Sequence, residues 1–162
     1  MEFCGVKWGK VGNSKEYFFG EYRFTLDDKN RFFIPAKFRE KLSLFGRILV
    51  LTRGLEKCLL LYPREEWINL TEKIGKLPFT SSEARKFSRY LFSGAYECEI
   101  DSQGRISLPA PLKKYAEIKK DIVIIGVGER IEIWGKEEWD KYTKEVEKEI
   151  EEIAGRLKEY GV

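Results

Sequence analysis

The chain has 162 residues, of which 43% are hydrophobic and 35% are charged, so its length suits one compact domain or two small units that share a core. It contains no histidine, which excludes the usual zinc ligand sets, the commonest general base and the Ser-His and Cys-His catalytic pairs. We therefore expect no enzyme, no metal site and no cofactor.

The remaining composition favours a cytoplasmic protein. No apolar run approaches the roughly 20 residues that a membrane span needs, and the N-terminal sequence shows no secretory signal. The three cysteines, Cys4, Cys58 and Cys98, are far apart and form no C-x-x-C motif, which fits a reduced intracellular state. We therefore expect no membrane partner.

The charge is modest but unevenly distributed. The formal net charge is +3, yet residues 136–160 hold nine acidic and six basic side chains, and the rest of the chain holds 18 acidic and 24 basic ones. A basic body with an acidic tail favours an anionic partner for the body.

The first half of the chain predicts short strands and turns. Residues 22–26 (YRFTL) alternate apolar and polar side chains, as a half-buried strand does. Residues 27–30 interrupt this pattern with turn residues, and Pro35 is placed to begin a helical turn over residues 36–42. The branched apolar run ILVL at residues 48–51 predicts a buried strand.

Helical patterns follow these strands. Residues 64–75 carry apolar side chains at helical spacing, and Pro78 ends the segment. The sequence TSSE at residues 80–83 is a capping-box pattern, which predicts that a second helix begins there.

The last helix is predicted over residues 136–160. Its apolar side chains recur at alternating spacings of three and four residues: Trp139, Tyr142, Val146, Ile150, Ile153, Leu157 and Tyr160. This stripe needs a partner surface, which is either the chain's own sheet or a helix or subunit across an interface. The length of the stripe favours the second alternative.

An internal repeat relates the two halves of the chain. The sequence LDDKNRFFIPAKFR at residues 26–39 matches IDSQGRISLPAPLK at residues 100–113, 74 positions later. The run ILVL at 48–51 meets IVII at 122–125, and after a two-residue deletion Trp67 meets Trp139. Two such copies predict a pseudo-twofold unit in which each copy supplies half of a shared core.

The repeated Asp-x-x-x-Arg loops are the candidate functional site. Asp27 and Asp101 can accept hydrogen bonds from backbone N–H groups of their own loops, so we interpret them as residues that hold the loop in shape. Arg31 and Arg105 have two open alternatives. Each can pair with its own Asp across the hairpin, or present its guanidinium to a phosphate or a guanine edge.

The neighbouring residues complete this set. Lys29 and Asn30 lie beside Arg31 in the first loop, and Gln103 lies beside Arg105 in the second. Asn30 and Gly104 stand at equivalent positions and are the residue types that best tolerate a positive φ. We interpret Gly104, Pro35 and Pro109 as structural, because a proline removes a backbone donor and suits the first turn of a helix.

The chain resembles the MraZ family over residues 18 to about 160. The resemblance rests on both Asp-x-x-x-Arg loops and on their framing sequences, GEYRFTLDDKNRFFIPAKFREKL, LTRGLEKCLLLYPREEW, ARKFSRYLFSGAYECEIDSQGRISLPAPL and IIGVGERIEIWGKEEW. It departs from the family in residues 1–17, which form an N-terminal extension, and in Asn30, where the second copy has glycine. We assign residues 18–92 to a first MraZ/AbrB-like repeat with linking helices and 93–162 to a second repeat with the C-terminal helix.

The resemblance implies an α+β, β-rich fold. In it, two AbrB/SpoVT-like repeats form a double-split, swapped-hairpin β-barrel with helices after each repeat. It also implies a nucleoid-associated transcriptional regulator of the bacterial division and cell wall gene cluster, assembled as a closed ring homo-oligomer. The DNA contacts would be Arg31, Arg105, Lys29, Asn30 and Gln103, acting on short direct repeats in promoter DNA. The alternative is a ring-forming module of AbrB-like fold that binds a protein partner.

Overall fold

The computed structural model describes residues 17–162, so the predicted extension, residues 1–17, lies outside the described part except for Tyr17. Eight strands and five α-helices follow one another in this part of the chain. The strands are β1 (Phe18–Thr25), β2 (Arg31–Phe33), β3 (Ile48–Arg53), β4 (Leu59–Pro63), β5 (Tyr96–Glu99), β6 (Arg105–Ser107), β7 (Asp121–Gly128) and β8 (Arg130–Gly135). The helices are α1 (Ala36–Leu42), α2 (Arg64–Gly75), α3 (Ser82–Ser93), α4 (Ala110–Tyr115) and α5 (Lys136–Leu157), with short 3₁₀ turns at Ser43–Phe45 and Lys158–Tyr160.

The strands form two antiparallel sheets that mix the two copies of the repeat. The larger sheet has the order β1-β7-β8-β4-β3-β5, and the smaller one pairs β2 with β6. The first strand of each copy therefore pairs with the third strand of the other copy. Tyr22 of β1 lies opposite Ile124 of β7, and Cys98 of β5 lies opposite Leu49 of β3.

The result is an α+β fold, as the family resemblance implied, and this exchange builds it from two interlocked halves that share a core, as the repeat predicted. The two sheets are not joined by strand pairing into one closed barrel among residues 17–162, so the predicted swapped-hairpin barrel is not confirmed. The β2–β6 pair is centred on Phe32 opposite Ile106, and both side chains are fully buried.

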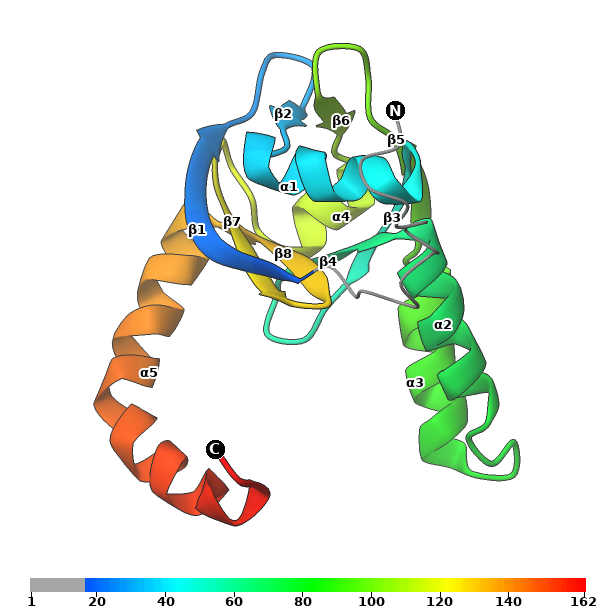
Figure 1. The fold of residues 1–162 in the computed structure, drawn as a ribbon, viewed down its shortest axis with the longest axis vertical. Coiled ribbons are helices and arrows are strands. Elements are labelled where there is room, and N and C mark those ends of the chain that lie inside the picture. The colour runs from blue at the N-terminus through cyan, green and yellow to red at the C-terminus, as the bar shows by residue number, and fades with distance from the viewer. Residues whose placement is uncertain (1–16) are drawn as a thin grey trace, which may run out of the picture.

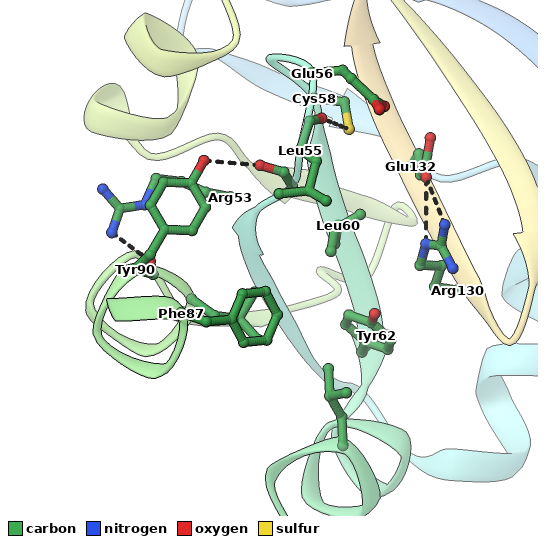
Figure 2. Close-up of a pocket in the computed structure, with 13 residues that line it drawn as sticks. Arg53, Leu55, Glu56, Cys58, Leu60, Tyr62, Phe87, Tyr90, Arg130 and Glu132 are labelled. Carbon is green, nitrogen blue, oxygen red and sulfur yellow. Dashed lines mark hydrogen bonds and ion pairs between the residues drawn. The ribbon is translucent and has the colours of Figure 1, made fainter. Parts of the chain in front are cut away.

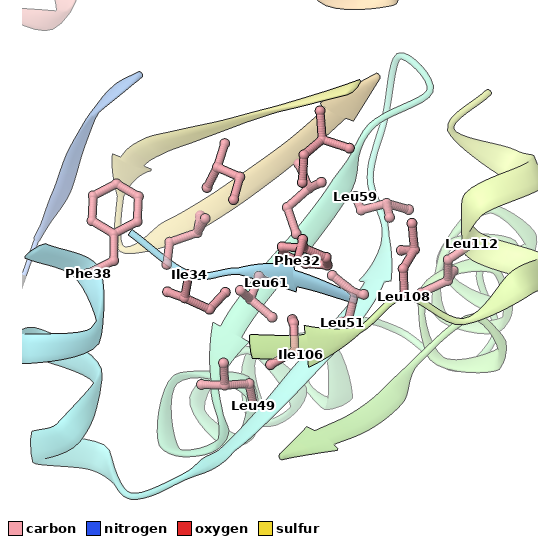
Figure 3. Close-up of a cluster of buried hydrophobic side chains, with 14 of the residues drawn as sticks. Phe32, Ile34, Phe38, Leu49, Leu51, Leu59, Leu61, Ile106, Leu108 and Leu112 are labelled. Carbon is pink, nitrogen blue, oxygen red and sulfur yellow. The ribbon is translucent and has the colours of Figure 1, made fainter. Parts of the chain in front are cut away.

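The hydrophobic core lies between the two sheets and receives side chains from both copies (Figure 3). Alternate residues of β3 and β4, such as Leu49, Leu51, Leu59 and Leu61, face this core and are completely buried. Helices α1 and α4 close the core with Phe38 and Leu112, as well as others from the same turns. Because each copy contributes half of the apolar surface, neither half can bury its own strands alone.

The longer helices extend from the body on two opposite sides (Figure 1). Helices α2 and α3 form one arm, and the hydroxyl of Ser81 accepts a hydrogen bond of 3.2 Å from the N–H of Ala84, which caps α3 one residue after Thr80, the N-cap of the predicted capping box. Helix α5 forms the other arm and has no buried residue, with Ile150 49% and Leu157 42% exposed. None of the helices in the described part of the chain is both long and apolar enough to cross a membrane.

Candidate nucleic-acid interface

The two Asp-x-x-x-Arg loops stand side by side at the end of the molecule that faces away from both helical arms (Figure 1). Each loop joins the first two strands of its copy, so the pairing of β2 with β6 brings the loops together. The N–H of Leu108 donates to the carbonyl of Asn30 at 2.8 Å, and the N–H of Ile34 donates to the carbonyl of Gly104 at 3.0 Å. Backbone hydrogen bonds therefore join each loop to the chain that follows the second strand of the other copy, although the two loops are 74 residues apart in the sequence.

The carboxylate of Asp27 organises the first loop from within. Its Oδ1 accepts hydrogen bonds from the N–H groups of Lys29 and Arg31, both at 2.9 Å. Its Oδ2 accepts from the Nε of Arg31 at 2.7 Å. The backbone of Asp27 closes the turn by accepting from Asn30 at 3.0 Å and donating to Arg31 at 2.9 Å. A short charged turn is thus held in one conformation by five hydrogen bonds.

The second loop reproduces this geometry bond for bond. The Oδ1 of Asp101 accepts from the N–H groups of Gln103 and Arg105 at 2.9 Å, and its Oδ2 accepts from the Nε of Arg105 at 2.9 Å. The N–H of Gly104 donates to the carbonyl of Asp101 at 3.0 Å. The two loops therefore have the same shape although only Asp and Arg are shared between positions 27–31 and 101–105.

Hydrogen bonding lowers the pKa of both loop carboxyls. For Asp27 the largest cause is the backbone N–H of Arg31, and the Arg31 side chain and the backbone N–H of Lys29 act in the same direction. The pKa of Asp101 is lowered by the corresponding groups of Arg105 and Gln103. Both carboxylates are thus stabilised in the ionised form that the loop geometry requires.

The two arginines occupy similar but unequal positions. Both form an ion pair with their own Asp, and the side chain of Arg31 is 29% exposed whereas that of Arg105 is 17% exposed. Arg105 also lies opposite Phe33 in the β2–β6 pair, with its guanidinium 6.0 Å from the ring centroid, and its Nη1 is 3.8 Å from the Oδ2 of Asp27. Pairing with Asp, one of the two alternatives that the sequence left open, is therefore present, and each arginine side chain is still partly exposed.

The exposed side chains at the loop tips are those that point away from the body. Lys29 and Asp28 are exposed in the first loop, and Ser102 and Gln103 are exposed in the second. The first tip is therefore charged and the second is polar and neutral. Lysine, serine and glutamine side chains donate hydrogen bonds to phosphates and base edges, so the paired tips can contact a nucleic acid.

Asn30 and Gly104 occupy the left-handed region that their equivalent positions predicted, with φ of 56° and 83°. Their surroundings were not predicted. The Nζ of Lys113 in α4 donates to the Oδ1 of Asn30 at 2.9 Å, and the guanidinium of Arg39 in α1 lies over Gly104. Each contact joins one copy to the loop of the other, so no pattern local to one copy could reveal it.

The two prolines begin helices, as their position in the sequence predicted. Pro35 is the N-cap residue of α1, and its carbonyl accepts from Phe38 and Arg39 at 2.9 Å. Pro109 stands in the same place before α4. Since each proline follows its loop by one short strand, it determines where the helix turns back under the loops.

A separate pocket of about 290 Å³ lies between the α2–α3 arm and the sheet (Figure 2). Its polar side chains are tied to neighbours: a guanidinium nitrogen of Arg53 donates to Ser93 at 2.7 Å, and Arg130 pairs with Glu132 at 3.1 Å. Burial raises the pKa of the Cys58 thiol to about 12, and the thiol donates to the carbonyl of Leu55. Cys58 is therefore a protonated, poorly nucleophilic group at neutral pH.

Comparison with known proteins places the chain in a family. A family model described as "MraZ protein, putative antitoxin-like" matches twice, over residues 17–90 and 91–159. The chain is 51% identical over 145 residues to the transcriptional regulator MraZ of Natranaerobius thermophilus, which covers 90% of this chain and 99% of that protein. It is also 51% identical over 140 residues to the transcriptional regulator MraZ of Heliobacterium modesticaldum, with coverages of 86% and 96%. With both copies of the repeat matched and half of the residues shared over nearly the whole length, the chain belongs to the MraZ family.

Proposed function

We propose that this protein is a sequence-specific DNA-binding transcriptional regulator rather than an enzyme. It acts in the bacterial cytoplasm, at the nucleoid, on promoters of the division and cell wall gene cluster. The observation that supports this proposal is the pair of Asp-clamped loops, which are presented together with their polar tips exposed. Relatives about 50% identical are named as transcriptional regulators, in line with this role.

The chemistry of the loops suits a duplex. Lys29 supplies a mobile charge for a phosphate, and Gln103 supplies both a donor and an acceptor for a base edge. Arg31 and Arg105 each donate from Nε to their own Asp, and Nη1 of Arg105 also lies 3.8 Å from the Oδ2 of Asp27. The terminal nitrogens of Arg31 are therefore the more available ones to reach a phosphate or guanine. A loop held in shape by its own carboxylate also loses little conformational entropy when it binds, so the clamp contributes to affinity indirectly.

We also propose that the protein assembles into a closed ring of identical subunits. The apolar stripe of helix α5 begins with Trp139 and Tyr142, which pack against Trp134 of the chain's own sheet, and continues to the exposed Ile150 and Leu157. The α2–α3 arm on the opposite side exposes Ile68 and Phe87 and carries a cluster of basic side chains on α3, Arg85, Lys86 and Arg89, whereas residues 136–160 are acidic overall. We place α5 of one subunit against the α2–α3 arm of the next.

Such a head-to-tail contact repeats in one direction and closes a ring when its rotation closes. Neighbouring subunits then present their loop pairs in the same orientation, which fits direct repeats in DNA rather than palindromes. Several weak loop contacts add through effective concentration, so short operator repeats suffice for tight binding.

Within one subunit we also propose that the two sheets form the swapped-hairpin barrel of AbrB-like proteins. The exchange of first strands between the copies and the shared core between the sheets support this arrangement. In it, β2 and β6 form the end of the barrel from which the loops extend.

The test is an equilibrium titration of the full chain with duplex DNA from the region upstream of its own gene. Lys29→Ala should weaken binding at least several-fold and reduce the slope of log affinity against log salt concentration by about 0.9 for each subunit bound to the DNA, because each loses one phosphate contact. Lys76→Ala is the matched control, since Lys76 is an exposed lysine at the end of α2, on the arm that points away from the loops. If Lys29→Ala and the wild type have equal affinities and equal salt slopes, the loop does not contact DNA.

The exposed stripe of α5 also favours a second candidate, a ring-forming module that binds a protein partner. In that case the loops are only rigid hairpins. The same titration separates the two functions, because a protein-binding module shows no preference for upstream DNA over unrelated DNA of equal length.

A further inference from the structure

We propose that Lys113 and Arg39 are positioning residues that lock the two loops of one subunit into a single DNA-reading unit. Each comes from the helix of one copy and fixes the loop of the other. This inference rests on the proposed function, since it concerns how the same loops meet DNA. It adds two residues, neither at a loop tip, and it implies that both loops of a subunit engage the duplex together.

The first brace runs from α4 to the first loop. The Nζ of Lys113 donates to the side-chain oxygen of Asn30 at 2.9 Å, and the N–H of Leu108 donates to the backbone carbonyl of the same Asn30 at 2.8 Å. Lys113 is half-buried, so its ammonium is held in the protein rather than swinging free in solvent. Asn30 is thus attached by both its side chain and its backbone to the second copy.

The second brace runs from α1 to the second loop. The guanidinium of Arg39 lies so close to Gly104 that a Cβ atom at position 104 would collide with Nη1 of Arg39. The Nε of Arg39 is buried and has no hydrogen-bond partner among the described residues, so packing over Gly104, rather than a hydrogen bond at Nε, keeps it in place. The carbonyl of Gly104 accepts from Ile34 of the first copy at 3.0 Å, which completes the attachment.

The two braces explain a difference between the copies. Positions 39 and 113 are equivalent in the repeat, and so are positions 30 and 104. Where the helix supplies lysine, the loop supplies an amide oxygen that accepts a hydrogen bond from it; where the helix supplies arginine, the loop supplies a glycine that leaves room for the larger group. Each brace therefore consists of a matched pair of residues, and exchanging one member alone breaks it.

The braces have a consequence for binding. The loops are already close, with Nη1 of Arg105 3.8 Å from the carboxylate of Asp27. When their relative position is fixed, a duplex that meets one tip meets the other without further ordering. Without a brace the loop keeps its own Asp clamp but can shift relative to its neighbour, so affinity falls while the loop itself stays folded.

A double-mutant cycle tests the first brace. Lys113→Met and Asn30→Gly are each expected to weaken binding of upstream duplex DNA by about three- to tenfold, and the double variant no further, because both remove the same contact. The salt slope of Lys113→Met should equal that of the wild type, since a positioning lysine releases no counterion. Losses of affinity that add in the double variant would show that Lys113 and Asn30 act independently and would overturn the inference. A salt slope of Lys113→Met reduced by about 0.9 per bound subunit would show that Lys113 contacts a phosphate, and would overturn it too.

An exchange of pairs tests the second brace. Gly104→Asn should weaken binding at least tenfold, because its side chain displaces Arg39. Gly104→Asn combined with Arg39→Lys recreates the lysine–asparagine pair of the other copy and should restore binding to within about threefold of the wild type. If the combined variant binds DNA no better than Gly104→Asn does, the inference is wrong. If Gly104→Asn does not fold, the combined variant is compared with Arg39→Lys instead, and the same result rejects the inference.

Hydrogen exchange separates this inference from the proposed function. Without DNA, Lys113→Met should raise the exchange of the Leu108 amide, which donates to the carbonyl of Asn30, and leave unchanged the clamped amides at 29–31 and those of α2. If the wild type binds no DNA, the proposed function fails and exchange still decides whether Lys113 braces the loop. If Lys113→Met leaves both the hydrogen exchange and the affinity for DNA unchanged, the brace is rejected and the proposed function is unaffected.

Discussion

At the scale of single residues, the two Asp-x-x-x-Arg loops share a motif but their arginines have different surroundings. Arg31 and Arg105 make the same bond to their own Asp, but Arg105 is further covered by Phe33 and lies near Asp27, whereas Arg31 lies opposite the small Ser107. The first loop therefore offers DNA the more accessible guanidinium as well as the exposed Lys29. We expect the first loop to carry more of the affinity than the second.

The lowered pKa values of the loop carboxyls predict how stability depends on pH. Because the pKa of Asp27 and of Asp101 in the folded protein lies below the ordinary value of 3.8, their stabilising effect is fully present above about pH 4 and is lost as the pH falls through the folded pKa. The double variant Asp27→Asn, Asp101→Asn should therefore melt below the wild type at pH 7. The difference should narrow as thermal unfolding is repeated toward pH 3. A difference that stays constant across this range would contradict the assigned role of the carboxylates.

At the scale of elements, β1 and β7 pack closely together at a pair of opposed glycines. Gly126 of β7 lies opposite Gly20 of β1, and a Cβ atom at position 126 would collide with the backbone nitrogen of Phe19. This pair joins the first strand of one copy to the third strand of the other. The approach of these two strands therefore depends on a residue without a side chain.

Gly126→Ala should destabilise the protein by about 3 kcal/mol, because the backbone of β1 must move to admit the methyl group. Gly155→Ala is the control, since Gly155 lies in α5 with open space around its Cα, and there alanine should stabilise by about 0.5–1 kcal/mol. Denaturant unfolding of both variants measures the difference. A loss below about 1 kcal/mol at position 126 would show that β1 is loosely attached.

The elements that were predictable from sequence are those with local signals. The helix at 64–75, the start of a helix within residues 80–83 and the helix starting at 136 follow from periodicity and turn chemistry, and the structure places them there. The pairing of β1 with β7 and of β5 with β3 was not predictable, since alternation shows that a strand exists but not which strand it pairs with. For the same reason the loop geometry was foreseeable from Asp27, whereas the contacts of Lys113 and Arg39 were not.

At the scale of the whole molecule, the arrangement separates two tasks. The loops occupy one end, and the two helical arms leave the body on opposite sides (Figure 1). The subunit contacts that we propose through the arms would therefore leave the loops free to bind DNA.

The assembly can be tested through α5. Ile150→Glu should lower the mass of the particle in solution, measured by light scattering, because it places a charge in the stripe that we assign to the subunit contact. Lys148→Glu introduces the same residue elsewhere on the helix and should leave the mass unchanged. If the wild type is a monomer, or if Ile150→Glu keeps the wild-type mass, α5 does not form the contact.

The proposed reading of DNA by the paired loops can be measured as a preference for one DNA sequence over another. The affinity of the wild type and of the double variant Arg31→Ala, Arg105→Ala should be compared on upstream duplex DNA and on unrelated DNA of equal length, at one salt concentration. We expect the wild type to prefer the upstream DNA by at least about 10³-fold and the double variant, still folded, to lose most of that preference. A double variant that keeps the wild-type affinity and preference would show that the paired loops do not read DNA.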